Sequence, residues 1–275
     1  MYLTLCDIPI EWRGTDCPRD LAVFGRADAE HDRPRLIIEG RSVDALPDVP
    51  EPEVVTGVTA MAHRGDVLVG WNTYEGMPDR TAVLEFDGVR ATVFIGPHTW
   101  ECSVLNMVML SLLPVVSRAG TLLVHASLVE YDGRAVAFTA ASGTGKSTQA
   151  DLWVEHLGAQ IMNGDRAFIR RIDGQWNAYG SPWSGSSPYV RNVWAPLAAV
   201  VVLEQAPRNR IRPLGALEMM PRLYNNIRYP FWDQAATEAS LATLDAMMKE
   251  VPIHLLSCRP DEEAARMTRD AVFGA

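Results

Sequence analysis

The chain has 275 residues, of which 48% are hydrophobic and 21% are charged. This balance is typical of an ordinary globular protein, and a chain of this length can bury a core that needs no disulfide or metal to hold it. The formal net charge of −9 argues against a general nucleic-acid binder, because a phosphate backbone attracts basic surfaces. The four cysteines form no CxxC pair, so neither a zinc site nor a redox motif is indicated, and reduced thiols are expected.

The N-terminal sequence carries acidic residues and no basic leader before an apolar run, so it does not predict a signal peptide. The most apolar stretch, residues 104–116, is shorter than the roughly 20 residues that a membrane span needs, and it contains Pro114. We therefore expect a cytoplasmic protein that acts without a membrane.

The N-terminal part of the chain, residues 1–117, is predicted to be rich in β-structure. Apolar or alternating runs separated by glycine, proline and aspartate predict strands, and Asp87-Gly88 between two such runs predicts a hairpin. Residues 103–116 predict a buried helix that closes this region. The runs expected as strands are 2–12, 35–40, 66–71, 81–88 and 91–96.

Strands alternate with helices in residues 118–275, which predicts an α/β domain with a mixed sheet and flanking helices, and an α+β fold overall. A helix is expected to follow a glycine-rich loop and to end at Gly158, and Asp261 is expected to cap a last helix. The run 197–204 is continuously apolar, as in a strand covered on both faces. The other expected strands are 121–131, 134–140, 159–165, 167–174, 175–180 and 253–258, and the other expected helices are 215–226 and 234–249.

Residues 140–147 read AASGTGKS and stand between an expected strand and an expected helix. In this context the pattern GxxxxGK[ST] indicates a phosphate-binding loop. Only the first position departs from it, because Ala140 replaces glycine. Alanine is the smallest change, but it restricts the backbone if this position needs a positive φ. The alternative interpretation is a glycine- and serine-rich turn that happens to contain a lysine.

A loop of this kind binds phosphate through its backbone and its lysine. Glycines let successive N–H groups turn inward around an anion, and the helix N-terminus adds unpaired donors and the positive end of its dipole. Lys146 is expected to reach the β- and γ-phosphates of a nucleotide, and the Ser147 hydroxyl to bind Mg²⁺. The expected nucleotide-binding residues are Ala141, Ser142, Gly143, Thr144, Gly145, Lys146, Ser147 and Thr148.

A magnesium ion also needs a carboxylate, and two acidic residues end expected strands. Asp165 follows an apolar run after the loop and can also accept the proton of an attacking hydroxyl, although Asn163-Gly164-Asp165 is turn chemistry in its own right. Glu204 ends the most strand-like run of the chain, where a glutamate is more often a solvated acid. His125 lies in the strand before the loop, where a lone histidine is usually a hydrogen-bonded core residue.

The segment HASLVEYDGRAVAFTAASGTGKSTQADLW, followed by IMNGDRAFI, resembles the catalytic core of the HPr kinase/phosphorylase family and its small kinase-like relatives. ATP-dependent phosphoenolpyruvate carboxykinases share this core. The resemblance covers residues 118–205 well and the C-terminal portion loosely. It implies a nucleotide-dependent kinase that uses Mg²⁺, with His125 beside the phosphate and Asp165 as a catalytic or metal-binding residue.

Two departures from the family pattern shape the expected function. The acidic motif of the family usually has two adjacent aspartates, whereas Gly164 precedes Asp165 here. Asp165 must then both bind Mg²⁺ and accept the proton of the attacking hydroxyl, or Glu204 must supply the second carboxylate. The downstream signature of HPr kinases themselves is also missing, so a kinase-like relative with another acceptor is expected.

The acceptor is expected to meet a loop rich in glycine, serine and proline at residues 178–192, which read AYGSPWSGSSPYVRN. Such a loop can cover a substrate, and Arg191 can bind an anionic group or the transferring phosphoryl group. A surface loop with no special role is the alternative. Residues 224–232 are a second candidate lid.

These observations predict an ATP- and Mg²⁺-dependent kinase in which Asp165 helps to deprotonate a hydroxyl acceptor, by positioning and electrostatics. The acceptor is a peptide or protein serine or a small-molecule alcohol, and the sequence does not choose between these, or between ATP, GTP and pyrophosphate as the donor. The alternative is a non-catalytic nucleotide-binding regulator. The family resemblance is consistent with a homo-oligomer.

Overall fold

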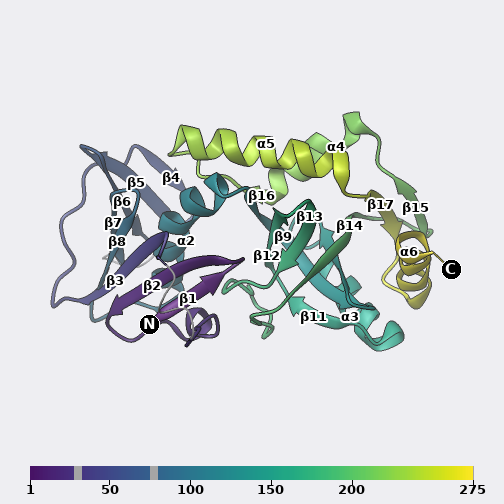
Figure 1. Cartoon of the computed structure of the whole chain (residues 1–275), viewed down its shortest axis with the longest axis horizontal. Coiled ribbons are helices and arrows are strands. Elements are labelled where there is room, and N and C mark those ends of the chain that lie inside the picture. Colours follow the sequence, from purple (N-terminus) through teal and green to yellow (C-terminus); the bar gives the residue numbers. More distant parts are fainter. Residues whose placement is uncertain (28–32, 75–79, 275) are drawn as a thin grey trace. The chain divides into compact units, whose positions relative to one another are not determined.

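The computed structural model describes residues 1–27, 33–74 and 80–274. The chain divides into two compact units, Met1–Val116 and Ser117–Ala275. Each unit contains one sheet together with helices (Figure 1). The predicted α/β class with a mixed sheet is therefore confirmed.

The N-terminal unit is built on an eight-stranded sheet with the order β1-β2-β3-β8-β7-β6-β5-β4. The pairings β2–β3 and β3–β8 are parallel, and the remaining neighbours are antiparallel. The strands are β1 Tyr2–Leu5, β2 Ile8–Gly14, β3 Leu36–Ser42, β4 Val54–Thr56, β5 Thr59–Arg64, β6 Val67–Asn72, β7 Val83–Phe86 and β8 Arg90–Ile95, and the helices are α1 Arg19–Ala22 and α2 Glu101–Arg118.

Two features of this sheet differ from the sequence prediction. The run 2–12 is not one strand: β1 and β2 form a hairpin in which Cys6 and Asp7 have φ values of 45° and 60°. Positive φ at both central positions matches the twist of a two-residue hairpin turn. The sequence does not predict β4 or β5. The strand β4 has only three residues, all exposed, and β5 has three successive buried residues, so neither shows an alternating pattern.

The helix α2 covers the stretch that was expected to form a buried helix, and it extends beyond it at both ends. Among the described residues it is the one helix that is long and apolar enough to cross a membrane. Of its 18-residue window, 72% is buried inside the structure. Such burial is what the core helix of a folded unit shows.

The C-terminal unit contains a nine-stranded sheet whose main path is β10-β9-β12-β13-β14-β17-β15. The strands β11 and β16 pair with β9, and β10 also pairs with β14 in parallel. The strands are β9 Thr121–Tyr131, β10 Arg134–Thr139, β11 Gln160–Asn163, β12 Arg166–Ile172, β13 Gln175–Tyr179, β14 Trp194–Gln205, β15 Arg210–Pro213, β16 Ile227–Arg228 and β17 Ile253–Cys258. The helices are α3 Lys146–Leu157, α4 Ala216–Leu223, the 3₁₀-helix η2 Tyr224–Asn226, α5 Gln234–Glu250 and α6 Glu262–Phe273.

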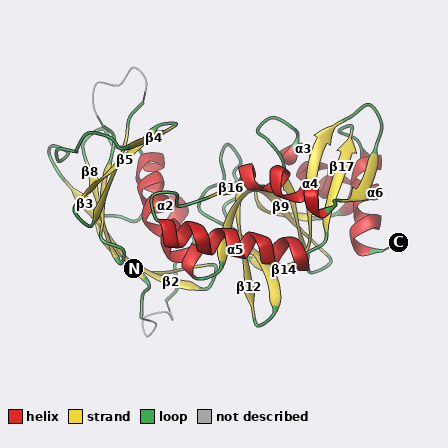
Figure 2. Ribbon diagram, turned by 90° about the horizontal axis from the view of Figure 1, so that it is seen from above, coloured by secondary structure: helices red, strands yellow, loops and turns green. Residues whose placement is uncertain are grey.

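Helices cover both faces of this sheet. Successive residues of a strand point to opposite faces, and on β14 Val200 belongs to one core cluster while Val201 belongs to the other. The first cluster includes Leu244 of α5, and the second includes Trp153 of α3. Figure 2 shows α5 lying across the sheet. The continuous apolar run of β14 is thus explained by burial on both sides.

Two helix ends that the sequence predicted are confirmed. Gly158 caps α3 in the left-handed conformation with φ 73°, which glycine adopts without steric cost. The Asp261 side chain accepts a hydrogen bond from the backbone N–H of Ala264 at 3.1 Å and so begins α6. The expected helix 215–226 is instead α4 followed by η2, with Pro221 inside α4.

Candidate phosphate-binding site

The loop of residues 140–145 connects β10 to α3, as the sequence pattern requires. Within it Gly143 has φ 78° and Gly145 has φ 121°. These two positions need the left-handed region that favours glycine. Gly145 is the N-cap of α3, and a helix N-terminus attracts anions through its unpaired N–H groups and dipole.

The missing first glycine does not disturb the loop. The residues with a positive φ in the described part of the chain do not include Ala140, so an alanine there is unstrained. Its side chain is 4% exposed and belongs to the core cluster that also holds Phe138 and Trp153. The Ala140 side chain therefore packs into the core, and its presence does not strain the backbone of the loop.

Lys146 lies folded beneath the loop. Its residue is 7% exposed, and its Nζ donates to the carbonyl oxygens of Ala140 at 3.1 Å and Ala141 at 3.4 Å. Burial lowers the pKa of Lys146, and the negative charge of Asp165 opposes that shift. The lysine is thus held at the loop, close enough to Asp165 for their charges to interact.

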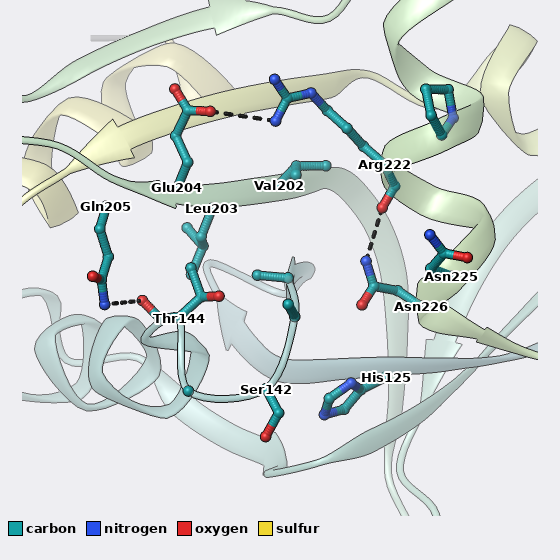
Figure 3. Close-up of a pocket in the computed structure, with 14 residues that line it drawn as sticks. His125, Ser142, Thr144, Val202, Leu203, Glu204, Gln205, Arg222, Asn225 and Asn226 are labelled. Carbon is teal, nitrogen blue, oxygen red and sulfur yellow. Dashed lines mark hydrogen bonds and ion pairs between the residues drawn. The ribbon is translucent and has the colours of Figure 1, made fainter.

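Two cavities adjoin the loop. The first, of about 730 Å³, opens between the loop, the end of β14 and the segment from α4 to η2 (Figure 3). The second, of about 560 Å³, lies between the loop, the start of α3 and the segment after β17. Both volumes fall in the range of ligand-binding pockets. Gln205 and Thr144 line both cavities, and they are joined by a 3.3 Å hydrogen bond from the Gln205 Nε2 to the Thr144 carbonyl.

The structure brings His125 and Asp165 together. Nε2 of His125 lies 3.2 Å from Oδ1 of Asp165, and Arg166 is the cross-strand partner of His125 on β12. The side chain of Asn163 accepts from the backbone N–H groups of Asp165 at 3.0 Å and Arg166 at 2.8 Å. Residues 163–165 therefore do form the turn that the sequence predicts, and this turn positions the Asp165 carboxylate.

The environment of Asp165 holds its pKa below the usual range. The hydrogen bond from His125 is the largest cause, burial opposes it, and the charges of Arg166, His125 and Lys146 add to the lowering. Asp165 is consequently ionised at neutral pH. An ionised carboxylate beside a histidine and a lysine can bind a cation or accept a proton.

Replacing His125 by alanine is expected to raise the pKa of Asp165 toward its ordinary value, because the largest lowering interaction is lost. A carboxylate with a lowered pKa stabilises the fold above its unfolded pKa, and this contribution disappears as the pH falls through the folded value. The variant should therefore have less of this stability at neutral pH, and its loss should be complete at a higher pH than in the wild type, because its folded pKa lies closer to the unfolded value. Unfolding measured between neutral and acidic pH, together with carboxyl NMR titration, checks this. An unchanged Asp165 titration would contradict it.

Gly164, which stands where the family pattern has a second aspartate, has no room for a side chain. A Cβ there would lie 2.2 Å from Cβ and Oγ of Ser187 and 3.4 Å from the carbonyl oxygen of Ser184. The loop between β13 and β14 occupies the space that a second carboxylate would need. One carboxylate at this turn is thus a consequence of how the chain packs.

The variant Gly164→Ala is expected to displace the loop and to destabilise the protein, by about 1–3 kcal/mol as overpacking typically does. Adding Ser187→Gly removes both of the atoms at 2.2 Å, so the double variant should recover part of the loss. Urea unfolding of the two single variants and the double variant measures this coupling. Additive effects would show that the two residues are not in contact.

Glu204 lines the first cavity but is already paired. Its carboxylate lies 3.3 Å from Nη1 of Arg222 (Figure 3), and it accepts from the Ser257 hydroxyl at 2.5 Å. The described residues contain no group of three or more His, Cys, Asp or Glu side chains placed to hold a metal. A Mg²⁺ bound with nucleotide phosphates needs only one or two protein carboxylates. The other predicted ligands are the exposed Ser147 hydroxyl and Asp165, which is itself paired with His125 at 3.2 Å and with Nε of Arg166 at 3.5 Å.

The remaining predicted residues are divided between the site and its surroundings. Ser142 lines the first cavity and Thr148 the second. Arg191 does not join them: its Nη1 lies 3.5 Å from the Gln160 side chain, and its guanidinium lies 5.7 Å from the centre of the Tyr189 ring. Gln160 begins β11, whereas Asp165 follows the other end of that strand. The Arg191 side chain is therefore directed toward the start of β11, although its neighbour Val190 pairs with Asn163 at the end of that strand.

Sequence reasoning missed part of the cavity wall. Arg222 and Asn225 line the first cavity (Figure 3), and so does Asn226, whose Nδ2 donates to the Arg222 carbonyl at 2.8 Å. The two asparagines lie in residues 224–232, which the sequence predicts as a candidate lid. No pattern in the sequence around Arg222 indicates that it lines the cavity, because its ion-pair partner Glu204 lies in a different part of the chain.

The sequence matches the family described as "SynChlorMet cassette protein ScmC" over residues 94–259, which is more than half of the chain. The chain belongs to the ScmC family. The matched region of this ScmC-family protein contains the loop, His125, Asp165 and Glu204. No curated protein matches it.

A solved structure similar to this ScmC-family protein is the Hpr(Ser) kinase/phosphatase from Coxiella burnetii. The two share 12% sequence identity with a TM-score of 0.34, over 54% of this chain and 95% of that chain.

Proposed function

We propose that this protein is an ATP- and Mg²⁺-dependent kinase that transfers the γ-phosphoryl group to a hydroxyl acceptor. The observation that carries the proposal is the meeting of three groups at one place. A loop with the phosphate-binding pattern holds Lys146 beneath it, and the paired His125 and Asp165 stand beside it. The sequence resemblance to the HPr kinase/phosphorylase core supports the same activity.

The nucleotide is proposed to bind across the loop. The phosphates lie against the loop amides and the N-terminus of α3, where the backbone favours anions. The second cavity, which runs from Gly145 and Thr148 toward Pro207 and Pro260, accommodates the nucleoside. The first cavity is then left for the acceptor and its approach to the γ-phosphate.

Lys146 and Asp165 carry the chemistry of the protein in this proposal. The ammonium group of Lys146 stabilises the negative charge of the γ-phosphate. Asp165 accepts the proton of the acceptor hydroxyl, and His125 orients the Asp165 carboxylate. When bound, Mg²⁺ would neutralise phosphate charge, with Ser147 and Asp165 to hold it. The proposal includes a cytoplasmic location, which the four free thiols support.

The proposal is tested by incubating the purified protein with Mg²⁺ and γ-labelled ATP against pooled peptide and small-alcohol acceptors, with Lys146→Ala alongside. Label that moves to an acceptor with wild type and not with the variant supports a kinase and identifies its acceptor class. Tight ATP binding without transfer to any pool would instead favour the non-catalytic regulator.

A further inference from the structure

The loop between β13 and β14 is fastened directly beside Asp165. The backbone N–H of Arg166 donates to the Trp183 carbonyl at 3.2 Å, and the Asn163 side chain donates to the Ser181 carbonyl at 3.0 Å. At its other end, Val190 forms an isolated bridge with Asn163. The loop is therefore held at both ends by the same turn that positions the carboxylate.

The tip of this loop is a tight turn that rests on the carboxylate. The backbone N–H of Ser187 donates to the Ser184 carbonyl at 3.1 Å, so Gly185 and Ser186 are the two central residues. Gly185 has φ 63°, and a Cβ there would lie 3.0 Å from Cγ of Asp165 and 3.3 Å from its Oδ1. The turn thus places Gly185, one of its two central residues, against the group proposed to act as the base.

The three serines of this turn differ in their surroundings. Ser184 is buried, with 9% of its surface exposed. The Ser187 hydroxyl packs on Gly164 and accepts from the backbone N–H of Tyr189 at 3.3 Å. Ser186 is exposed, and within the described part of the chain its hydroxyl makes no hydrogen bond. Ser186 is thus the hydroxyl that is free to react.

We propose that Ser186 is an internal phosphoacceptor, so that the protein phosphorylates its own β13–β14 loop. This inference rests on the proposed kinase function. Ser186 directly follows Gly185, whose Cβ position lies 3.0 Å from Cγ of Asp165, and the transfer requires the turn to move until the Ser186 hydroxyl reaches the carboxylate. A tethered acceptor also reacts without the entropic cost of bringing in a second molecule.

The step is an ordinary phosphoryl transfer from bound ATP. The Ser186 hydroxyl gives its proton to Asp165, and its oxygen forms a bond to the γ-phosphorus. The bond from that phosphorus to the β–γ bridging oxygen breaks, and ADP leaves with the electron pair. The product, phosphoserine, places about two negative charges beside Asp165, so like-charge repulsion is expected to move the turn away from the carboxylate.

The test uses the full chain with Mg²⁺ and γ-labelled ATP and no added acceptor, followed by peptide mapping. Label is expected on Ser186, with a rate constant that does not change on dilution, because the reaction is intramolecular. Ser186→Ala should lose the label, whereas the matched variant Ser187→Ala should keep it. Two further measurements on Ser186→Ala show separately whether the kinase itself is intact: ATP binding, and transfer of the γ-label to the acceptor pools.

Two results would overturn the inference. One is transfer to an added acceptor with no label on the chain, which leaves the proposed kinase standing. The other is label that maps to a residue other than Ser186 and persists in Ser186→Ala. Absence of both ATP binding and transfer removes the proposed function and this inference together.

Discussion

Replacing Asp165 by asparagine is expected to lower phosphoryl transfer roughly 10²–10⁴-fold, the range over which a positioned general base contributes. Asparagine keeps the size of the side chain but cannot accept the proton of a hydroxyl. ATP binding should persist, because the loop amides and Lys146 remain. Initial rates of label transfer at saturating ATP, and ATP affinity by calorimetry, measure the two effects separately.

The matched control for this variant is Asp151→Asn, which changes an exposed aspartate on α3. It should leave both transfer and binding as in the wild type. A wild-type transfer rate in Asp165→Asn would contradict the role of this carboxylate. Loss of folding, seen by circular dichroism, would be distinguished from loss of chemistry by the retained ATP affinity.

Replacing Trp153 by alanine is expected to destabilise the C-terminal unit by about 3–5 kcal/mol, the usual cost of removing a buried large aromatic side chain. Trp153 is 0% exposed. Its ring centre lies 5.5 Å from that of Phe138 and 5.7 Å from that of Tyr131. It anchors α3, which begins at Lys146, so the phosphate-binding loop should loosen as well.

Urea unfolding of Trp153→Ala measures this cost, and Val154→Ala is the control. Val154 is the next residue on the helix and is 41% exposed, so its substitution should change stability by no more than about 0.5 kcal/mol. Trp153→Phe should cost less than alanine, since the indole N–H has no hydrogen-bond partner to lose among the described residues. Equal effects of the alanine variants at 153 and 154 would contradict the assigned core.

Much of the C-terminal unit could be predicted because its signals are local. The apolar run of β14, the cap residues Gly158 and Asp261, and the strand–loop–helix order around Lys146 all depend on residues close together in the sequence. The same holds for the phosphate-binding pattern. Its departure at Ala140 raised a question about backbone strain that only the φ values could answer.

The rest of the site depends on contacts between distant residues, which no local pattern records. The Cβ position of Gly164 is blocked by Ser187, and Glu204 is paired with Arg222, although each pair is well separated along the chain. Arg191 carries a suitable charge but is directed elsewhere by its packing. The short strands β15 and β16 were missed for the same reason, since their pairing with distant strands defines them.

The most direct test of the phosphate-binding site is ATP binding, measured by isothermal titration calorimetry with Mg²⁺ on the wild type and on Lys146→Ala. The wild type is expected to bind one nucleotide per chain, and the variant to bind it much more weakly, because it lacks the ammonium group held beneath the loop. No binding by the wild type, or equal affinity in both proteins, would contradict a nucleotide site at residues 140–147.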